Sequence, residues 1–216
     1  MAVLWSGGSG EHARWTVLAR ASAVRVLEPA ADPAAWARSL QPASAAHRDA
    51  IAPGWMVCLG YELGGVLEPV ARGAEANRWP LAVAVRCDDA WVRDNHRGVW
   101  HSVGSPPALE ATPPRAWRAG PLASAMGESG YAARAARAVE YIRAGDVYQV
   151  NLAHELSGPF HGSARGLFRD WVERSGAWYG AYLEWDAVER RRAVLSASPE
   201  LFMAFDPASR RLVTRP

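Results

Sequence analysis

The octapeptide Gly145 to Leu152, with the sequence GDVYQVNL, places polar side chains inside an alternating apolar run. Side chains two residues apart in a β-strand point to the same face, so Gln149 and Asn151 would share one face of a strand. A half-solvated strand that turns its polar face to water is the simpler interpretation of this pattern taken alone. Gln149 cannot serve as a general base, because an amide does not titrate.

The basic residues limit the chemistry further, since all 24 residues counted as Lys and Arg are arginine. The chain as written cannot use a lysine nucleophile, a lysine Schiff base or the phosphate-binding lysine of a P-loop. Cys58 and Cys87 belong to no CxxC or Cys/His cluster, and the six histidines show no ligand spacing, so metal binding is not indicated. Without a signal peptide or an apolar run that could span a bilayer, two reduced thiols in a cytoplasmic protein are expected.

Length and charge favour an ordinary globular protein. The chain has 216 residues, of which 50% are hydrophobic, and eleven are tryptophan. Its formal net charge of +2 indicates neither a nucleic acid nor an acidic surface as partner. The one basic run, Arg190 to Arg192, fits a solvated turn between two strands.

A Pro-rich connector divides the chain, because residues 104–128 carry Pro106-Pro107, Pro113-Pro114 and Pro121 among Ala, Ser and Gly. We therefore predict an N-terminal region over 1–103 and a second region over 129–216. In the first region, Asp32 and Pro33 predict the start of a helix. Asn95 to Gly98 predicts a hairpin turn. The expected strands there are Arg14–Ala19, Trp55–Leu59, Leu81–Val85, Trp91–Arg93 and Val99–Val103.

The second region predicts a helix capped by Ser129 and ended by Gly145, and another helix from about Ser163. The expected strands are Val147–Leu156, Trp178–Trp185, Ala193–Ala197, Leu201–Phe205 and Leu212–Thr214. Helices interspersed with consecutive strands predict an α+β fold, with antiparallel sheets and flanking helices.

Three motifs together carry a family resemblance: GDVYQVNL, then Ser196-Ala197-Ser198-Pro199-Glu200, then Thr214-Arg215-Pro216. Their order and separation resemble the chorismate-binding enzymes, specifically component I of aminodeoxychorismate synthase, with anthranilate synthase component I as the nearest relative. The segment Gly60-Tyr61-Glu62-Leu63-Gly64 is similar to the GYxLG segment of the aminodeoxychorismate branch. The resemblance implies the β-sandwich of anthranilate synthase component I, incomplete at its C-terminal side.

Individual positions within the resemblance favour one branch. Tyr148 and Asn151 match the YQVNL form of the aminodeoxychorismate enzymes, whereas anthranilate synthases typically read FQVVL. Relatives that add water to chorismate have a lysine where this chain has Gln149, so an ammonia-using member is implied.

The resemblance also implies a mechanism, in which chorismate exchanges its C4 hydroxyl for an amino group supplied as ammonia by a glutaminase subunit. The family's SPE glutamate, here Glu200, would be the general acid. For Glu200 to hold its proton near neutral pH, burial or nearby negative charge must raise its pKa. Taken without the motif, Glu200 is an ordinary glutamate at the start of a strand.

Other family groups have no counterpart in these residues. The family's nucleophilic lysine comes two residues after TRP, and the glutamates that bind Mg²⁺ come later. We therefore expect the 216 residues alone neither to bind Mg²⁺-chorismate nor to turn over. We also expect poor solubility, since uncovered sheet edges and apolar faces favour aggregation.

A tryptophan pocket is a second family feature, and its matching positions are Ser6, Arg14, Trp15, Trp178 and Tyr179. Trp178 stands where the family usually has proline, so its ring could fill the pocket itself. Trp15 and Trp178 as plain core aromatics remain an alternative. For the chain as a whole, anthranilate synthase component I is one alternative, and a non-catalytic fragment with a small-molecule or partner-binding surface is another.

Overall fold

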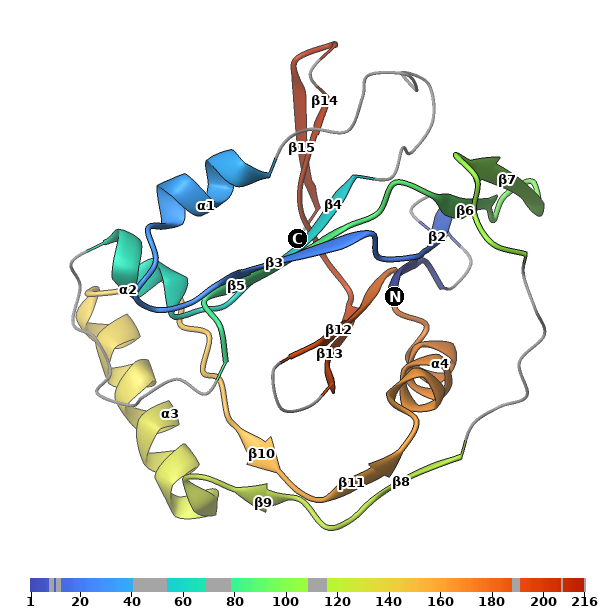
Figure 1. Ribbon diagram of the computed structural model, residues 1–216. Helices are drawn as coiled ribbons and strands as arrows, with labels where there is room; N and C mark the ends of the chain where they lie inside the picture. Colours follow the sequence, from blue (N-terminus) through green and yellow to red (C-terminus); the bar gives the residue numbers. More distant parts are fainter. Residues whose placement is uncertain are drawn as a thin grey trace. The chain divides into compact units, whose positions relative to one another are not determined.

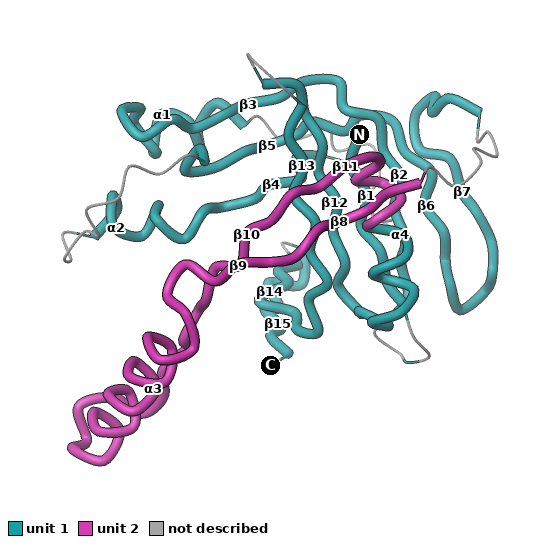
Figure 2. Tube along the Cα trace, turned by 90° about the horizontal axis from the view of Figure 1, so that it is seen from below, with its two compact units in different colours: residues 1–112, 168–216 teal, residues 113–167 magenta. Residues whose placement is uncertain are grey.

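The computed structural model describes residues 1–7, 10, 13–40, 54–68, 79–108, 116–187, 191–206 and 208–215. They divide into two compact units (Figure 2). Unit 1 comprises residues 1–112 and 168–216, and unit 2 comprises residues 113–167.

A six-stranded antiparallel sheet organises unit 1, in the order β13-β12-β1-β2-β6-β7 (Figure 1). The N-terminal strand lies inside this sheet, where Ala2 pairs with Ala19 on one side and with Leu183 on the other. The strands are β1 (Ala2–Trp5), β2 (Trp15–Ala19), β6 (Ala90–Asp94), β7 (Val99–Val103), β12 (Tyr179–Asp186) and β13 (Arg191–Ser198).

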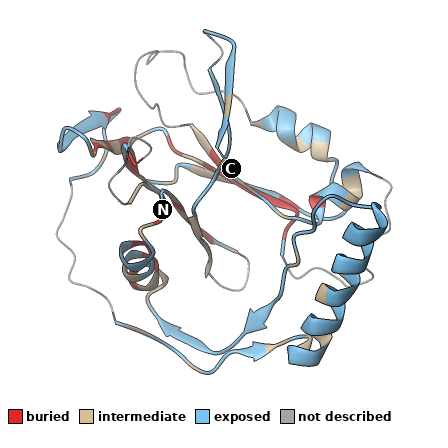
Figure 3. Cartoon of the chain, turned by 180° about the vertical axis from the view of Figure 1, so that it is seen from behind, coloured by how far each residue is buried: buried red, intermediate tan, exposed pale blue. Residues whose placement is uncertain are grey.

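A smaller antiparallel sheet of unit 1 has the order β3 (Ala23–Leu27), β5 (Ala82–Arg86), β4 (Trp55–Leu59). One buried cluster joins the two sheets, with Val83 and Val85 from β5 and Leu183 and Trp185 from β12 among its members. A second buried cluster forms around Leu27 and packs against helices α1 (Pro33–Ser39) and α2 (Leu63–Leu67). These clusters belong to the core of unit 1, and Figure 3 colours its buried residues red.

The remaining elements of unit 1 are a hairpin and most of a helix. Strands β14 (Leu201–Asp206) and β15 (Arg211–Arg215) pair only with each other among the described strands. Helix α4 (Ala164–Ser175) begins in unit 2, and within unit 1 its Phe168 ring packs on Tyr182 at a centroid distance of 5.4 Å.

Unit 2 consists of one long helix and two short strand pairs. Helix α3 (Gly127–Ala144) has no buried residue, and Figure 3 shows it almost entirely pale blue. Strand β8 (Trp117–Ala119) pairs with β11 (Phe160–Gly162), and β9 (Ala123–Ser124) pairs with β10 (Leu156–Ser157). Both β8 and β9 lie within the predicted Pro-rich connector. The predicted domain boundaries 1–103, 104–128 and 129–216 stay a prediction, because a compact unit of the structure is not the same thing as an independent domain.

The predicted α+β fold with antiparallel sheets and flanking helices is confirmed. The cap at Asp32 is also confirmed, since its carboxylate accepts the Ala34 N–H at 2.8 Å. The turn before β7 is present, with Gly98 at a φ of 68°. Of the motifs quoted above, Pro113-Pro114, Arg190 and Pro216 lie outside the described residues.

Three local predictions are wrong. Residues 147–155 form no strand, because no described strand pairs with them and nothing buries their apolar side; Tyr148 is 94% exposed. Ser129 does not cap α3, which starts two residues earlier where Ser124 Oγ accepts the Gly127 N–H at 2.9 Å. Arg191 and Arg192 lie in β13 and not in a turn; Arg191 is held there by ion pairs with Glu184 and Asp186 on the paired strand.

No helix in the described part of the chain is long and apolar enough to cross a membrane.

Candidate functional site

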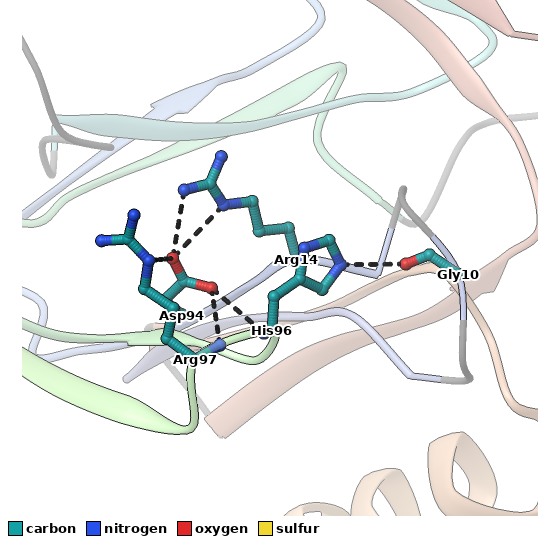
Figure 4. A network of polar contacts seen from close by, with 5 residues as sticks. All are labelled: Gly10, Arg14, Asp94, His96 and Arg97. Carbon is teal, nitrogen blue, oxygen red and sulfur yellow. Dashed lines mark hydrogen bonds and ion pairs between the residues drawn. The ribbon is translucent and has the colours of Figure 1, made fainter.

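A buried carboxylate organises the polar residues at one end of the large sheet (Figure 4). The Asp94 residue is only 2% exposed. Arg14 donates to its Oδ2 from Nε at 3.3 Å and from an Nη at 3.1 Å. The backbone N–H groups of His96 and Arg97 donate to Oδ1 at 3.0 and 3.3 Å. Four donors therefore satisfy a carboxylate that would otherwise be costly to bury.

These donors determine the protonation state of Asp94. Burial by itself would raise its pKa, but the hydrogen bond and charge of Arg14 and the backbone donors outweigh burial, so the pKa lies below the ordinary value. Asp94 is thus an anion that fixes Arg14 at the start of β2.

Asn95, the next residue, ties three chain segments together. Its Nδ2 lies 3.2 Å from the carbonyl oxygens of Ser6 and Ala13, and 3.1 Å from Thr16 Oγ1. Its backbone N–H donates to the Arg14 carbonyl at 2.7 Å. The turn after β6 therefore positions the chain on both sides of β1 and β2.

The predicted tryptophan-pocket residues come from these same segments of unit 1. Trp5 pairs with Gly180, and the Gly7 N–H donates to the Ala177 carbonyl at 2.8 Å. Ser6 lies between those two contacts, so its backbone runs alongside Trp178 and Tyr179. The structure thus brings the Ser6 and Trp178-Tyr179 segments together.

Arg14 and Trp15 complete the set from the neighbouring strand. The Arg14 guanidinium carbon lies 4.5 Å from the centroid of the Trp15 ring, a cation-π contact. Trp15 is half-buried and packs against the main core, whereas Trp178 is 41% exposed. The core interpretation therefore fits Trp15 and does not fit Trp178.

Glu200 lies in the bend between β13 and β14. Its backbone N–H lies 3.3 Å from Ser198 Oγ, which in turn donates to the Glu200 carbonyl at 3.0 Å. The residue is exposed, so the described residues do not supply the burial expected for a general acid.

Gln149 belongs to unit 2, where it is exposed in a segment without regular structure. The preceding helix ends as predicted, because Gly145 adopts a φ of 80° and donates to the Ile142 carbonyl. Gln149 and Glu200 therefore lie in different units.

The described residues offer no cluster of metal-ligating side chains. Among them, no group of three His, Cys, Asp or Glu side chains could hold a metal ion.

Sequence reasoning missed the contributions of Asp94 and Asn95. Both occur in Arg93-Asp94-Asn95-His96-Arg97-Gly98, where Asp and Asn are typical turn residues. That composition predicts the turn, but only the register of β2 on β6, with Trp15 opposite Asp94, puts Arg14 beside the carboxylate.

A family model described as chorismate binding enzyme matches residues 1–216, and the chain belongs to this family. Anthranilate synthase component 1 of Thermus thermophilus is 40% identical over 80 residues, which cover 37% of this chain and 16% of that protein.

The crystal structure of anthranilate synthase component I from Streptococcus pneumoniae has the same fold, with a TM-score of 0.64. Its sequence is 15% identical, and the match covers 93% of this chain. The chain spans 53% of the length of that solved relative.

Proposed function

We propose that this chain belongs to an aminodeoxychorismate synthase component I, an enzyme that aminates chorismate at C4. The observation that carries this proposal is the YQVNL form of residues 148–152, with Tyr148 and Asn151 where anthranilate synthases have Phe and Val. Gln149 supports an ammonia-using enzyme, because a glutamine cannot activate water as a base.

In the proposed reaction a C–N bond forms at C4 of chorismate and the C4–O bond breaks. Glu200 donates a proton to the departing hydroxyl, which leaves as water, and ammonia supplies the nitrogen. A positioned general acid contributes roughly 100- to 10,000-fold in rate. Since Glu200 is exposed in unit 1, this role requires further structure around it in the active enzyme.

The partners follow from the same proposal. Ammonia comes from a glutamine amidotransferase subunit, and chorismate is the substrate. Mg²⁺, which the family uses with this anionic substrate, would be held by residues other than those described here.

Product identification tests the proposal. The natural protein that carries these residues is incubated with chorismate, Mg²⁺ and ammonium, and the products are separated chromatographically. We expect 4-amino-4-deoxychorismate, and we expect Glu200→Gln to reduce kcat by about 100-fold or more. Glu128→Gln, an exposed glutamate in the first turn of α3, is the matched control and should keep full activity.

Anthranilate synthase component I is the second candidate, because both relatives reported above carry that name. It would release anthranilate and pyruvate from the same assay. Formation of anthranilate as the main product would overturn the aminodeoxychorismate proposal. The 216 residues alone are a separate arm of the experiment, and we expect no product from them.

The tryptophan pocket is proposed for residues Ser6, Arg14, Trp15, Trp178 and Tyr179. The support is that β1, β2 and β12 bring these segments together in unit 1. Isothermal titration with tryptophan measures it. Heat that disappears in Tyr179→Ala but persists in Tyr61→Ala, a 97% exposed tyrosine elsewhere in unit 1, would support the pocket. Absence of heat with the unaltered chain would exclude it.

A further inference from the structure

A cavity of about 240 Å³ lies in unit 1, apart from the residues considered above. One wall is the face of β12 and β13 that carries Trp185 and Val194, and the opposite wall is the face of β4 and β5 that carries Cys58 and Val83. The strand register explains why these side chains share a face. Cys58 lies directly opposite Val83 on the paired strand, and Val194 lies opposite Leu183, whose side chain is on the same face as that of Trp185 two residues later.

The cavity walls are apolar and partly aromatic. Trp79 and Trp185 meet edge to face, with their centroids 6.1 Å apart and an interplanar angle of 65°. Trp185 is 4% exposed and belongs to the main core, so this wall is rigid. An engineered cavity of about 150 Å³ is large enough to bind benzene, so this one can accept one ring or two fused rings.

Among the described residues that line the cavity, Glu62 is the one with a charge. Its side chain is exposed and makes no hydrogen bond or ion pair with another residue in the described ranges. Its Oε2 lies near the cavity floor, 3.5 Å from where a Cβ would stand on Gly60. A carboxylate beside an aromatic wall favours a ligand with a positive charge next to a ring.

Arg192 is a positive group beside this aromatic pair, and its guanidinium carbon lies 5.4 Å from the centroid of Trp79. Because that cation already lies over the Trp79 ring, the wall left for a ligand ring is Trp185 with Val83 and Val194. A ligand ring on that wall would leave an attached ammonium group free to reach Glu62.

From this geometry we propose that the cavity between the two sheets of unit 1 binds a small aromatic amine, with its ring against Trp185 and its ammonium group at Glu62. The ligand class is an arylalkylamine of one or two fused rings. This proposal does not rest on the proposed function, because none of its residues takes part in the reaction described above.

Because Cys58 lines the cavity, protection of its thiol from alkylation measures ligand binding there directly. Iodoacetamide modifies the chain with and without tryptamine, and mass spectrometry follows Cys58 and Cys87 separately. A cysteine peptide in the same solution corrects for reagent lost to the amine. We expect tryptamine to slow the alkylation of Cys58 severalfold and to leave the alkylation of buried Cys87 unchanged. Tryptamine should protect Cys58 better than indole or indole-3-propionate does.

Two variants assign the contacts. Glu62→Gln should weaken tryptamine binding by about two- to fivefold, the effect of an exposed ion pair, and should abolish the preference over indole. Glu28→Gln, an exposed glutamate of the same unit, is the matched control. Val194→Phe should fill the cavity and remove protection by all three compounds, with circular dichroism confirming that the variant is folded.

The proposal fails if tryptamine does not protect Cys58 at the limit of its solubility. It also fails if indole-3-propionate protects Cys58 as well as tryptamine does, because the Glu62 carboxylate would then not select a positively charged ligand over a negatively charged one. Equal tryptamine affinity in Glu62→Gln and in the unaltered chain would likewise overturn it.

Discussion

At the scale of single residues, Asp94 links the turn after β6 to the start of β2. Its carboxylate accepts hydrogen bonds from Arg14 and from two backbone N–H groups while it is almost completely buried. Loss of the Arg14 guanidinium would leave a buried anion with fewer donors, which is the costly case for charged groups inside proteins.

Asp94 should make the stability of unit 1 depend on pH in acid. Its folded pKa lies below the ordinary value of 3.8, so folding favours the anion. That contribution is complete above the ordinary value and is lost as the pH falls through the lower folded value. Urea unfolding of the unaltered chain should therefore show declining stability below about pH 4, and Asp94→Asn should be less stable at neutral pH with a flatter acid dependence.

Asp186→Asn is the control for that experiment, since Asp186 forms an exposed ion pair with Arg191. We expect Asp186→Asn to lower the free energy of unfolding by at most about 1 kcal/mol. An Asp94→Asn variant as stable as the unaltered chain at pH 7 would contradict the structural role given to the carboxylate.

Cys87 should produce the opposite dependence in alkali. Burial raises its pKa to about 11 from the ordinary 9.0. Folding favours the protonated thiol, so its contribution is present below the ordinary value and is lost as the pH rises through the folded value. The stability advantage of the unaltered chain over Cys87→Ala should shrink between pH 9 and 11, by at most on the order of 2 kcal/mol.

Cys58→Ala serves for comparison, because Cys58 is only half-buried; burial raises the pKa of its thiol as well. Equal alkaline behaviour of the two variants in urea titrations would show that burial of Cys87 is not the cause.

At the scale of elements, the end of α3 depends on one glycine. Gly145 has a φ of 80°, a conformation that an L-residue with a side chain adopts only with strain. Gly145→Ala should destabilise the last turn of α3 by about 1 kcal/mol, measured as faster amide hydrogen exchange at Ile142 to Asp146.

Gly64→Ala is the matched substitution, and we expect it to have the opposite effect on helix stability. Gly64 lies inside α2 with helical geometry, and a methyl group there would meet no atom within 4 Å. Alanine should stabilise that helix by up to about 1 kcal/mol. Slower exchange at the end of α3 in Gly145→Ala would refute the strain argument.

Local signals in the sequence predicted most elements well. Each of these signals specifies a backbone conformation locally, through a side chain or, for glycine, through the lack of one. The structure contains the helix start at Asp32 and Pro33, the turn at Asn95 to Gly98 and the helix end at Gly145. The strand predicted for residues 147–155 is wrong, because a strand depends on a partner that its own sequence does not specify. Alternation describes which side could be buried, not whether anything covers it.

The candidate site was less accessible to sequence reasoning. Asp94 looks like a turn residue, and its contact with Arg14 spans 80 positions of the chain. The cavity near Cys58 depends on the packing of two sheets, which no single segment encodes. The roles of Glu200 and Gln149 come from family motifs, and their geometry in these two units does not test them.

At the scale of the whole molecule, the two units differ in how much they bury. Unit 1 has two buried hydrophobic clusters, one of which includes Val17, Val85 and Trp185. In unit 2, Gly166 is the one buried residue in the described part, and Tyr131, Val139 and Ile142 on α3 are 39 to 45% exposed. Most of the packing energy therefore lies in unit 1.

The hairpin β14–β15 is the surface of unit 1 most prone to association. A two-stranded hairpin with open edges is marginal alone, and here Phe202 is 87% and Phe205 60% exposed. We expect the unaltered chain to self-associate and to bind a hydrophobic dye, and the double variant Phe202→Thr, Phe205→Thr to reduce both severalfold. Sedimentation velocity measures the association.

Leu59→Thr tests whether any exposed apolar side chain would have this effect, since Leu59 is 61% exposed on β4. An equal reduction by Leu59→Thr would point to general surface apolarity. A monomeric unaltered chain with one cooperative melting transition would contradict the expected poor solubility.

The interior position of β1 has a consequence for synthesis of the protein. Ala2 needs Leu183 as its partner on one side, and 181 positions separate them. At roughly 5 to 20 residues per second, a ribosome takes about 10 to 40 seconds to make that interval. During translation β1 can pair with β2 within moments, but its other edge waits until Leu183 has been made. Completion of the large sheet is therefore a late event, governed by closure of a very long loop and so by the topology of the fold.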